Sequence, residues 1–102
     1  MGFFQSLFGR RPFPADRKDE VERMIADLVR IGKVDDFLSE RPGGSFNLQC
    51  RHIRAREIGG RLNDIGSTEL MEYAQRRVKK SLGENLAAHL SYAWTDIGKW
   101  IP

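Results

Sequence analysis

Apolar residues in the second half of the chain recur every three or four positions, in three runs separated by Gly66 and Gly83. This spacing places each run on one side of a helix. Glycine readily ends a helix because it adopts positive φ. The pattern therefore predicts three consecutive helices. Their predicted buried residues are Ile58, Leu62, Ile65, Leu70, Ala74, Val78, Leu86, Leu90, Ala93 and Ile97.

The first half predicts one long helix and a shorter one. The long helix starts near Asp16, and Gly32 is expected to end it. Its predicted buried residues are Val21, Ile25, Leu28 and Ile31. Residues 34–41 predict one or two helical turns, and residues 41–46 predict a loop because they contain a proline and two glycines.

These elements fit one domain, since a chain of 102 residues can bury a sizeable core. Pro12 and Pro14 separate an N-terminal apolar and basic segment, residues 1–14, from residues 15–102. We expect an all-α fold, a small bundle of four main helices plus a short extra helix. Gly59 and Gly60 lie inside a predicted helix, where they permit either a close helix crossing or a kink.

The C-terminal end adds a further expectation. Trp100 and Ile101 follow Gly98, and hydrophobic residues after a glycine that ends a helix often fold back onto the core. We therefore expect both side chains to pack against the bundle.

The cysteine count and hydropathy narrow the class of protein. Cys50 is the single cysteine, so it has no partner for an internal disulfide, and a reducing cytoplasm is expected. No spacing of Cys and His predicts a metal site, and no cofactor motif occurs. No apolar run approaches the roughly 20 residues that span a bilayer, and no secretion signal opens the chain.

The chain carries a net charge of +3, and the excess lies in its second half. The basic residues there form two clusters: Arg51, Arg54, Arg56, Arg61 and Arg76, Arg77, Lys79, Lys80. Arg54 and Arg61 alternate with Glu57 and Asp64 at helical spacing, which predicts an ion-pair ladder within one helix. The second cluster ends a helix, where cations complement the helix dipole. This pattern argues against nucleic acid as a partner.

Candidate catalytic residues are few. His89, Tyr92 and Asp96 fall on one flank of the last predicted helix, so a relay from Asp96 to His89 is the one enzymatic hypothesis. Cys50 and His52 would point about 200° apart on a helix. We expect no catalytic residues.

The N-terminal segment carries a candidate interaction site. Phe3, Phe4, Leu7 and Phe8 form an apolar stripe on a two-turn helix, followed by two arginines. This stripe either covers the core, binds a partner, or makes weak contact with a membrane surface. Arg77, Lys79 and Lys80 are further candidate interaction residues and form a predicted charged rim.

From Arg51 onward the chain contains GRLNDIGSTELMEYAQRRV and ends in AWTDIGKWIP. This half resembles short uncharacterised bacterial helical proteins that share a glycine-containing helix link and an IGxW ending. The resemblance implies an independent helical unit and carries no activity.

The sequence therefore predicts a non-enzymatic helical module for protein–protein interaction or self-association. The alternative is a peripheral membrane or nucleic-acid-contacting adaptor in the cytoplasm. An enzyme that uses His89 and Asp96 is the third hypothesis.

Overall fold

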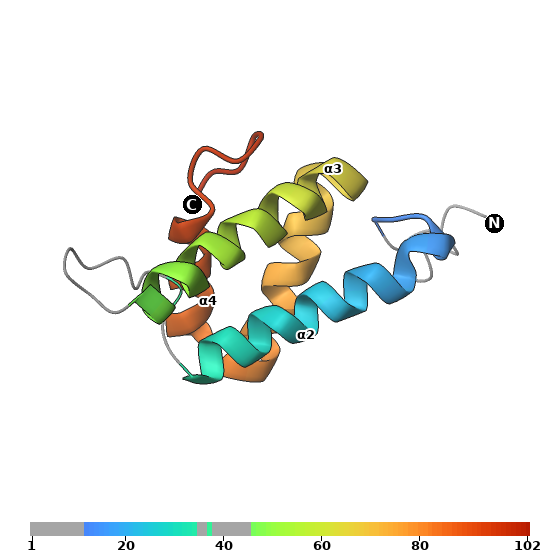
Figure 1. Cartoon of the computed structure of the whole chain (residues 1–102). Helices are drawn as coiled ribbons and strands as arrows, with labels where there is room; N and C mark the ends of the chain where they lie inside the picture. The colour runs from blue at the N-terminus through green and yellow to red at the C-terminus, as the bar shows by residue number, and fades with distance from the viewer. Residues whose placement is uncertain (1–11, 35–36, 38–45) are drawn as a thin grey trace.

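The computed structural model describes residues 12–34, 37 and 46–102, and for residues 46–51 the backbone alone. The described residues form a short 3-10 helix, η1 (Ala15–Arg17), and three α-helices: α2 (Lys18–Val34), α3 (Phe46–Leu82) and α4 (Glu84–Ala93) (Figure 1). They contain no strand. The all-α class is therefore confirmed.

Helix α3 is bent sharply at two residues. Gly66 has φ −141° and ψ 19°, and Ser67 has φ 61° and ψ −164°, so neither is helical. The bend, here called the elbow, separates a first arm, residues 46–65, from a second arm, residues 68–82, which turns back (Figure 1).

The predicted count of four main helices plus a short extra helix is wrong. Two of the predicted helices are the two arms of α3, which are joined through the non-helical Gly66 and Ser67 with no loop between them. The extra helix was expected at residues 34–41. Val34 is the last residue of α2, Phe37 lies in a turn, and the other residues of this range lie outside the described residues. The expected loop at 41–46 lies outside the described residues except for Phe46, which begins α3.

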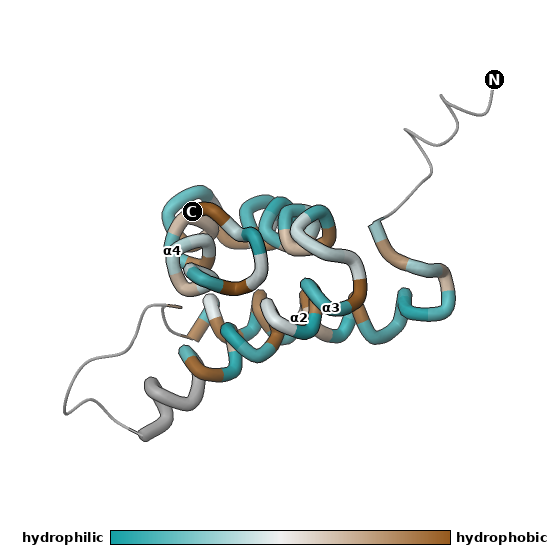
Figure 2. The backbone as a smooth tube through the Cα atoms, turned by 90° about the horizontal axis from the view of Figure 1, so that it is seen from above, coloured by the Kyte–Doolittle hydropathy of each residue, from teal (hydrophilic) through white to brown (hydrophobic). Residues whose placement is uncertain are grey.

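The helices form two layers around one core. Helix α2 and the first arm of α3 run antiparallel in one layer, and the second arm and α4 form the other (Figures 1 and 2). Ile65, Leu86 and Ile97 are only partly buried. All the other helix residues predicted above to be buried belong to the buried core, which also contains residues that were not predicted. The core residues are Val21, Met24, Ile25, Leu28, Ile31, Phe37, Ala55, Ile58, Leu62, Leu70, Met71, Ala74, Val78, Leu90, Ala93, Trp94 and Trp100.

The sequence predicted that Gly32 ends the first long helix, and this prediction is wrong. Helix α2 continues to Val34, and Gly32 is buried within it. A Cβ atom at this position would lie 2.9 Å from Cζ of Phe37 and closer still to the Leu82 side chain. The glycine therefore allows Phe37 and the second arm of α3 to pack directly against the α2 backbone.

Gly59 serves a close contact, not a kink. The first arm stays helical there, since the non-helical residues of α3 are at the elbow. The fully buried Trp94 lies across Gly59, and an added Cβ would be 2.5 Å from the indole Nε1. That Nε1 donates a hydrogen bond to the Ala55 carbonyl oxygen at 2.9 Å. Gly60 has nothing within 4 Å of an added Cβ.

The C-terminal tail folds back over the end of α4 (Figure 1). Trp100 packs edge-on against Trp94 with ring centroids 5.1 Å apart, and its Nε1 donates to the Ser91 carbonyl oxygen at 2.8 Å. The expectation for Trp100 is therefore confirmed. For Ile101 it is wrong, because this side chain is 86% exposed.

Candidate functional site

An aromatic and charged cluster joins the start of the described chain to two helices. The half-buried Phe13 packs edge-on against Tyr73 of the second arm, with centroids 5.7 Å apart. Arg77, one turn later, lies over the Tyr73 ring at 5.8 Å and donates to the Tyr73 hydroxyl at 3.1 Å. Its two Nη atoms each donate to Glu22 of α2 at 2.9 Å. These four residues are called the Phe13 cluster below.

The ion pair in the Phe13 cluster is of the strong, two-bonded kind. A planar guanidinium matches a carboxylate with two parallel hydrogen bonds. These bonds to Glu22 raise the pKa of Arg77 above its ordinary value, because they stabilise the charged form more than partial burial destabilises it. The pair thus links α2 to the second arm of α3, across the two layers.

The Phe13 cluster fixes the position of the first described residues. Phe13 is held on Tyr73, and the carbonyl oxygen of Pro12 lies against Gly66 at the elbow. The first described residues therefore lie beside the elbow. The predicted stripe itself lies outside the described residues: Phe3, Phe4, Leu7 and Phe8.

Two of the three residues of the predicted charged rim form ion pairs within the chain. Arg77 is committed to Glu22 and Tyr73, and Lys79 lies 3.5 Å from Glu84 at the start of α4. Lys80 is exposed. Of the three cations, Arg77 is the one that lies in the Phe13 cluster, next to the first described residues.

The predicted ladder on the first arm pairs mainly with a different helix. Arg54 Nε donates to Asp27 at 3.1 Å, and Arg61 Nε donates to Glu20 at 2.6 Å. Within the first arm, Arg54 and Glu57 lie 3.8 Å apart. The hydrogen bond from Arg61 lowers the pKa of Glu20 below its ordinary value. Neither of these acidic partners on α2 was predicted from the sequence.

A signal for these partners was present in the sequence. Glu20 and Asp27 are seven residues apart on α2, and Arg54 and Arg61 are seven apart on α3. Seven residues make about two helical turns, so antiparallel helices bring such pairs into contact at both ends. Matched spacing of opposite charges on two predicted helices is thus a usable sign of their packing.

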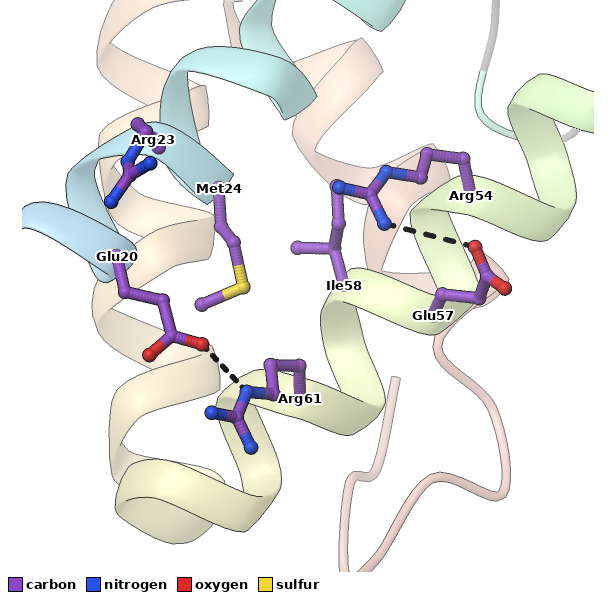
Figure 3. A pocket seen from close by; sticks show the side chains of 7 residues that line it. All are labelled: Glu20, Arg23, Met24, Arg54, Glu57, Ile58 and Arg61. Carbon is purple, nitrogen blue, oxygen red and sulfur yellow. Dashed lines mark hydrogen bonds and ion pairs between the residues drawn. The ribbon is translucent and has the colours of Figure 1, made fainter. Parts of the chain in front are cut away.

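A cleft of about 350 Å³ lies between the Glu20–Arg61 ion pair, which joins α2 to α3, and the Arg54–Glu57 pair within α3 (Figure 3). Met24 and Ile58, both buried in the core, form its apolar floor. Its rim carries charges of both signs: Glu20, Arg23, Arg54, Glu57 and Arg61. Because Arg54 and Arg61 already face carboxylates, the rim offers no concentrated positive field to an anion.

Arg56, a member of the first basic cluster that lies outside the predicted ladder, binds the end of α4. Its Nη1 donates to the carbonyl oxygens of Ala93 at 2.7 Å and Thr95 at 2.9 Å. A cation at this place satisfies carbonyls that lack helical partners and complements the negative end of the α4 dipole. Arg56 therefore ties the end of α4 to the first arm.

The helical spacing that suggested a relay from Asp96 to His89 is not present in the structure. Helix α4 ends at Ala93, and Asp96 has a positive φ of 70°, so the helical spacing from His89 does not extend to Asp96. His52 is buried, and its Nδ1 lies 2.7 Å from the Phe37 carbonyl oxygen. Since that oxygen only accepts, Nδ1 carries the proton. This bond holds residue 37 against α3.

Within the described part of the chain, no three His, Cys, Asp or Glu side chains lie close enough together to hold a metal ion. In the same residues, no helix is both long and apolar enough to span a membrane. The chain matches no known protein family, no curated protein and no solved structure.

Proposed function

We propose that this chain is a non-enzymatic helical interaction module, which binds another protein or a second copy of itself through its N-terminal stripe. The observation that carries the proposal is the attachment of Phe13 to Tyr73 beside Arg77. An apolar segment that leaves a rigid surface at a fixed point pays less ordering entropy on binding than a free tail. Arg77, which is paired with Glu22, supports the Tyr73 ring on which Phe13 packs.

The use of the basic side chains favours a protein partner over nucleic acid. Arg54, Arg61 and Arg77 face carboxylates, and Arg56 caps α4. Phosphate binding depends on cations that are free to replace counterions along the backbone. Four of the arginines that made nucleic acid an alternative thus already stabilise the fold.

The remaining expectations belong to the same proposal. The single Cys50 favours a cytoplasmic protein, and the resemblance of the second half to short bacterial helical proteins fits an independent module. Peripheral contact with a membrane through residues 1–11 is the competing outcome, because an apolar stripe beside Arg10 and Arg11 also suits an anionic lipid surface.

The test is removal of residues 2–11 from the full chain, which leaves Phe13 in place. We expect the helical circular-dichroism signal to be unchanged and the association, measured by sedimentation velocity, to be lost. A quadruple replacement of Phe3, Phe4, Leu7 and Phe8 by serine should act like the deletion. Replacement of Gln5 and Ser6 by alanine is the matched control and should have no effect.

Two results would decide against docking on a protein. Unchanged sedimentation after the deletion would remove the stripe from self-association, and failure to co-sediment with any protein from the source cell would remove a hetero-partner. Stripe-dependent binding to phosphatidylserine vesicles, with no protein association, would replace the proposal by the membrane alternative.

A further inference from the structure

The elbow of α3 is a hinge of only two residues. Residues on both sides of Gly66 and Ser67 are helical, so a change at these two positions would join the arms into one straight helix. A straight α3 of 37 residues would be about 55 Å long. The bent form, in contrast, needs Ser67 at φ 61° and ψ −164°, a region that is essentially restricted to glycine.

The elbow also divides the described chain into two units, and some ion pairs and hydrogen bonds lie entirely within one unit. The N-terminal unit comprises residues 12–65, and its pairs Arg54–Asp27 and Arg61–Glu20 lie within it. The C-terminal unit comprises residues 68–102. Its internal contacts include Gln75 to Ala87 and Trp100 to Ser91.

A second set of contacts joins the two units across the layers. Arg77 binds Glu22, and Phe13 packs on Tyr73. Trp94 lies on Gly59 and bonds to Ala55, and Arg56 caps the end of α4. None of these contacts includes a hinge residue. The N-terminal unit of one chain can therefore make all of them with the C-terminal unit of another.

We propose that two copies of this chain exchange these units, with α3 straight in both copies. The exchanged dimer keeps this second set of contacts and relieves the positive φ of Ser67 twice. Short hinges under strain favour such exchange, because closing the monomer stores strain that the dimer lacks. The partner is thus a second copy of the chain. The proposal rests on the self-association branch of the proposed function but does not use the N-terminal stripe.

The hinge provides the first test. Ser67→Gly removes the strain of the bent form and weakens a straight helix, so it should shift the protein toward the monomer. Ser67→Ala keeps the strain and favours a straight helix, so it should shift the protein toward the dimer. Because each dimer contains two hinges, we expect the dimer dissociation constants of the two variants to differ at least a hundredfold. Light scattering after refolding from urea at graded chain concentrations measures them.

Charge reversal provides a second test that does not touch the hinge. Glu22→Arg and Arg77→Glu each place like charges across the layers, so each variant alone should be destabilised. In an exchanged heterodimer, residue 22 of each chain faces residue 77 of the other chain, and both of these pairs again join opposite charges. The co-refolded mixture should therefore form a heterodimer, identified by native mass spectrometry, that melts at a higher temperature than either variant alone.

A matched control uses an ion pair inside one unit. Glu20→Arg and Arg61→Glu reverse the charges of a pair that stays within one chain after exchange, so mixing these two variants should restore nothing. Mixing that rescues both pairs equally would overturn the exchange.

The remaining outcomes are equally decisive. A single-chain mass for the wild type and for Ser67→Ala at every concentration would overturn the proposal. Association that is lost on deletion of residues 2–11 but is insensitive to the hinge would also overturn it, and would support docking through the stripe. Conversely, hinge-dependent dimers that survive the deletion would support exchange without the stripe.

Discussion

Gly59 and Gly60 are neighbours in one helix, and the structure assigns opposite effects to alanine at the two positions. At Gly59 an added Cβ would lie 2.5 Å from Trp94 Nε1 and 2.6 Å from its Cδ1. Carbon atoms in ordinary contact are about 3.5–4.0 Å apart. The indole would therefore have to move by about 1 Å. Trp94 is fully buried, so the surrounding side chains would have to move with it.

The magnitude follows from three contributions. Overpacking a core costs about 1–3 kcal/mol. A shift of the indole also weakens its hydrogen bond to Ala55, and an unsatisfied buried donor costs about 1–3 kcal/mol. Alanine regains about 1 kcal/mol relative to glycine in a helix interior. We expect Gly59→Ala to lower the free energy of unfolding by about 3 kcal/mol.

Gly60→Ala is the matched control. An added Cβ there meets nothing within 4 Å, so only the gain in helix propensity remains. We expect it to raise the free energy of unfolding by up to about 1 kcal/mol. Urea denaturation followed by far-UV circular dichroism and by tryptophan fluorescence measures both variants. If Gly59→Ala proved as stable as Gly60→Ala, the close contact between Trp94 and the first arm would be refuted.

Three further predictions concern single contacts. Trp94→Phe keeps an aromatic ring but removes the hydrogen bond to Ala55. It should lower the free energy of unfolding, measured by urea denaturation, by about 1–2 kcal/mol, more than Trp100→Phe, because the Trp100 hydrogen bond is only part-buried. Equal losses for the two variants would contradict this ranking. Arg56→Met should destabilise the end of α4 by about 1–2 kcal/mol, because it removes the hydrogen bonds to the Ala93 and Thr95 carbonyl oxygens. Amide hydrogen exchange in residues 93–95 should become faster, and unchanged exchange would show that Arg56 does not cap α4. Glu20 has a lowered pKa in the folded chain, so its stabilising effect is present above its ordinary value of 4.5 and is lost as the pH falls through the lowered pKa. A carboxyl NMR titration should show this pKa rising in Arg61→Met, and no change between the two proteins would contradict the ion pair.

Much of the core could be predicted from the sequence because burial in a helix follows a simple period. Residues that recur every three or four positions share one face, whatever the face contacts. Leu62, Leu70, Val78 and Leu90 were placed in this way, and all are fully buried. The same reasoning could not show which helices meet, since period alone does not specify a partner.

The candidate site was only partly predictable for the same reason. Arg77 was identified from its charge, but its partners Glu22 and Tyr73 were not. Glu22 is 55 residues away in sequence, and Phe13 is 60 away from Tyr73. Contacts over such separations depend on how the helices pack, which no local pattern encodes.

The glycines show most clearly what the sequence by itself determined about this protein and what only the tertiary structure decided. Glycine at 66 indicated a break between two helices, and the elbow of α3 lies there, because backbone freedom is a local property. Gly32 gave the same local signal, and Gly59 indicated either a kink or a close crossing, yet both lie inside intact helices. Their role is set by Phe37, Leu82 and Trp94, which approach from other parts of the chain. A missing side chain indicates either a turn or a close contact, and only the packed fold distinguishes them.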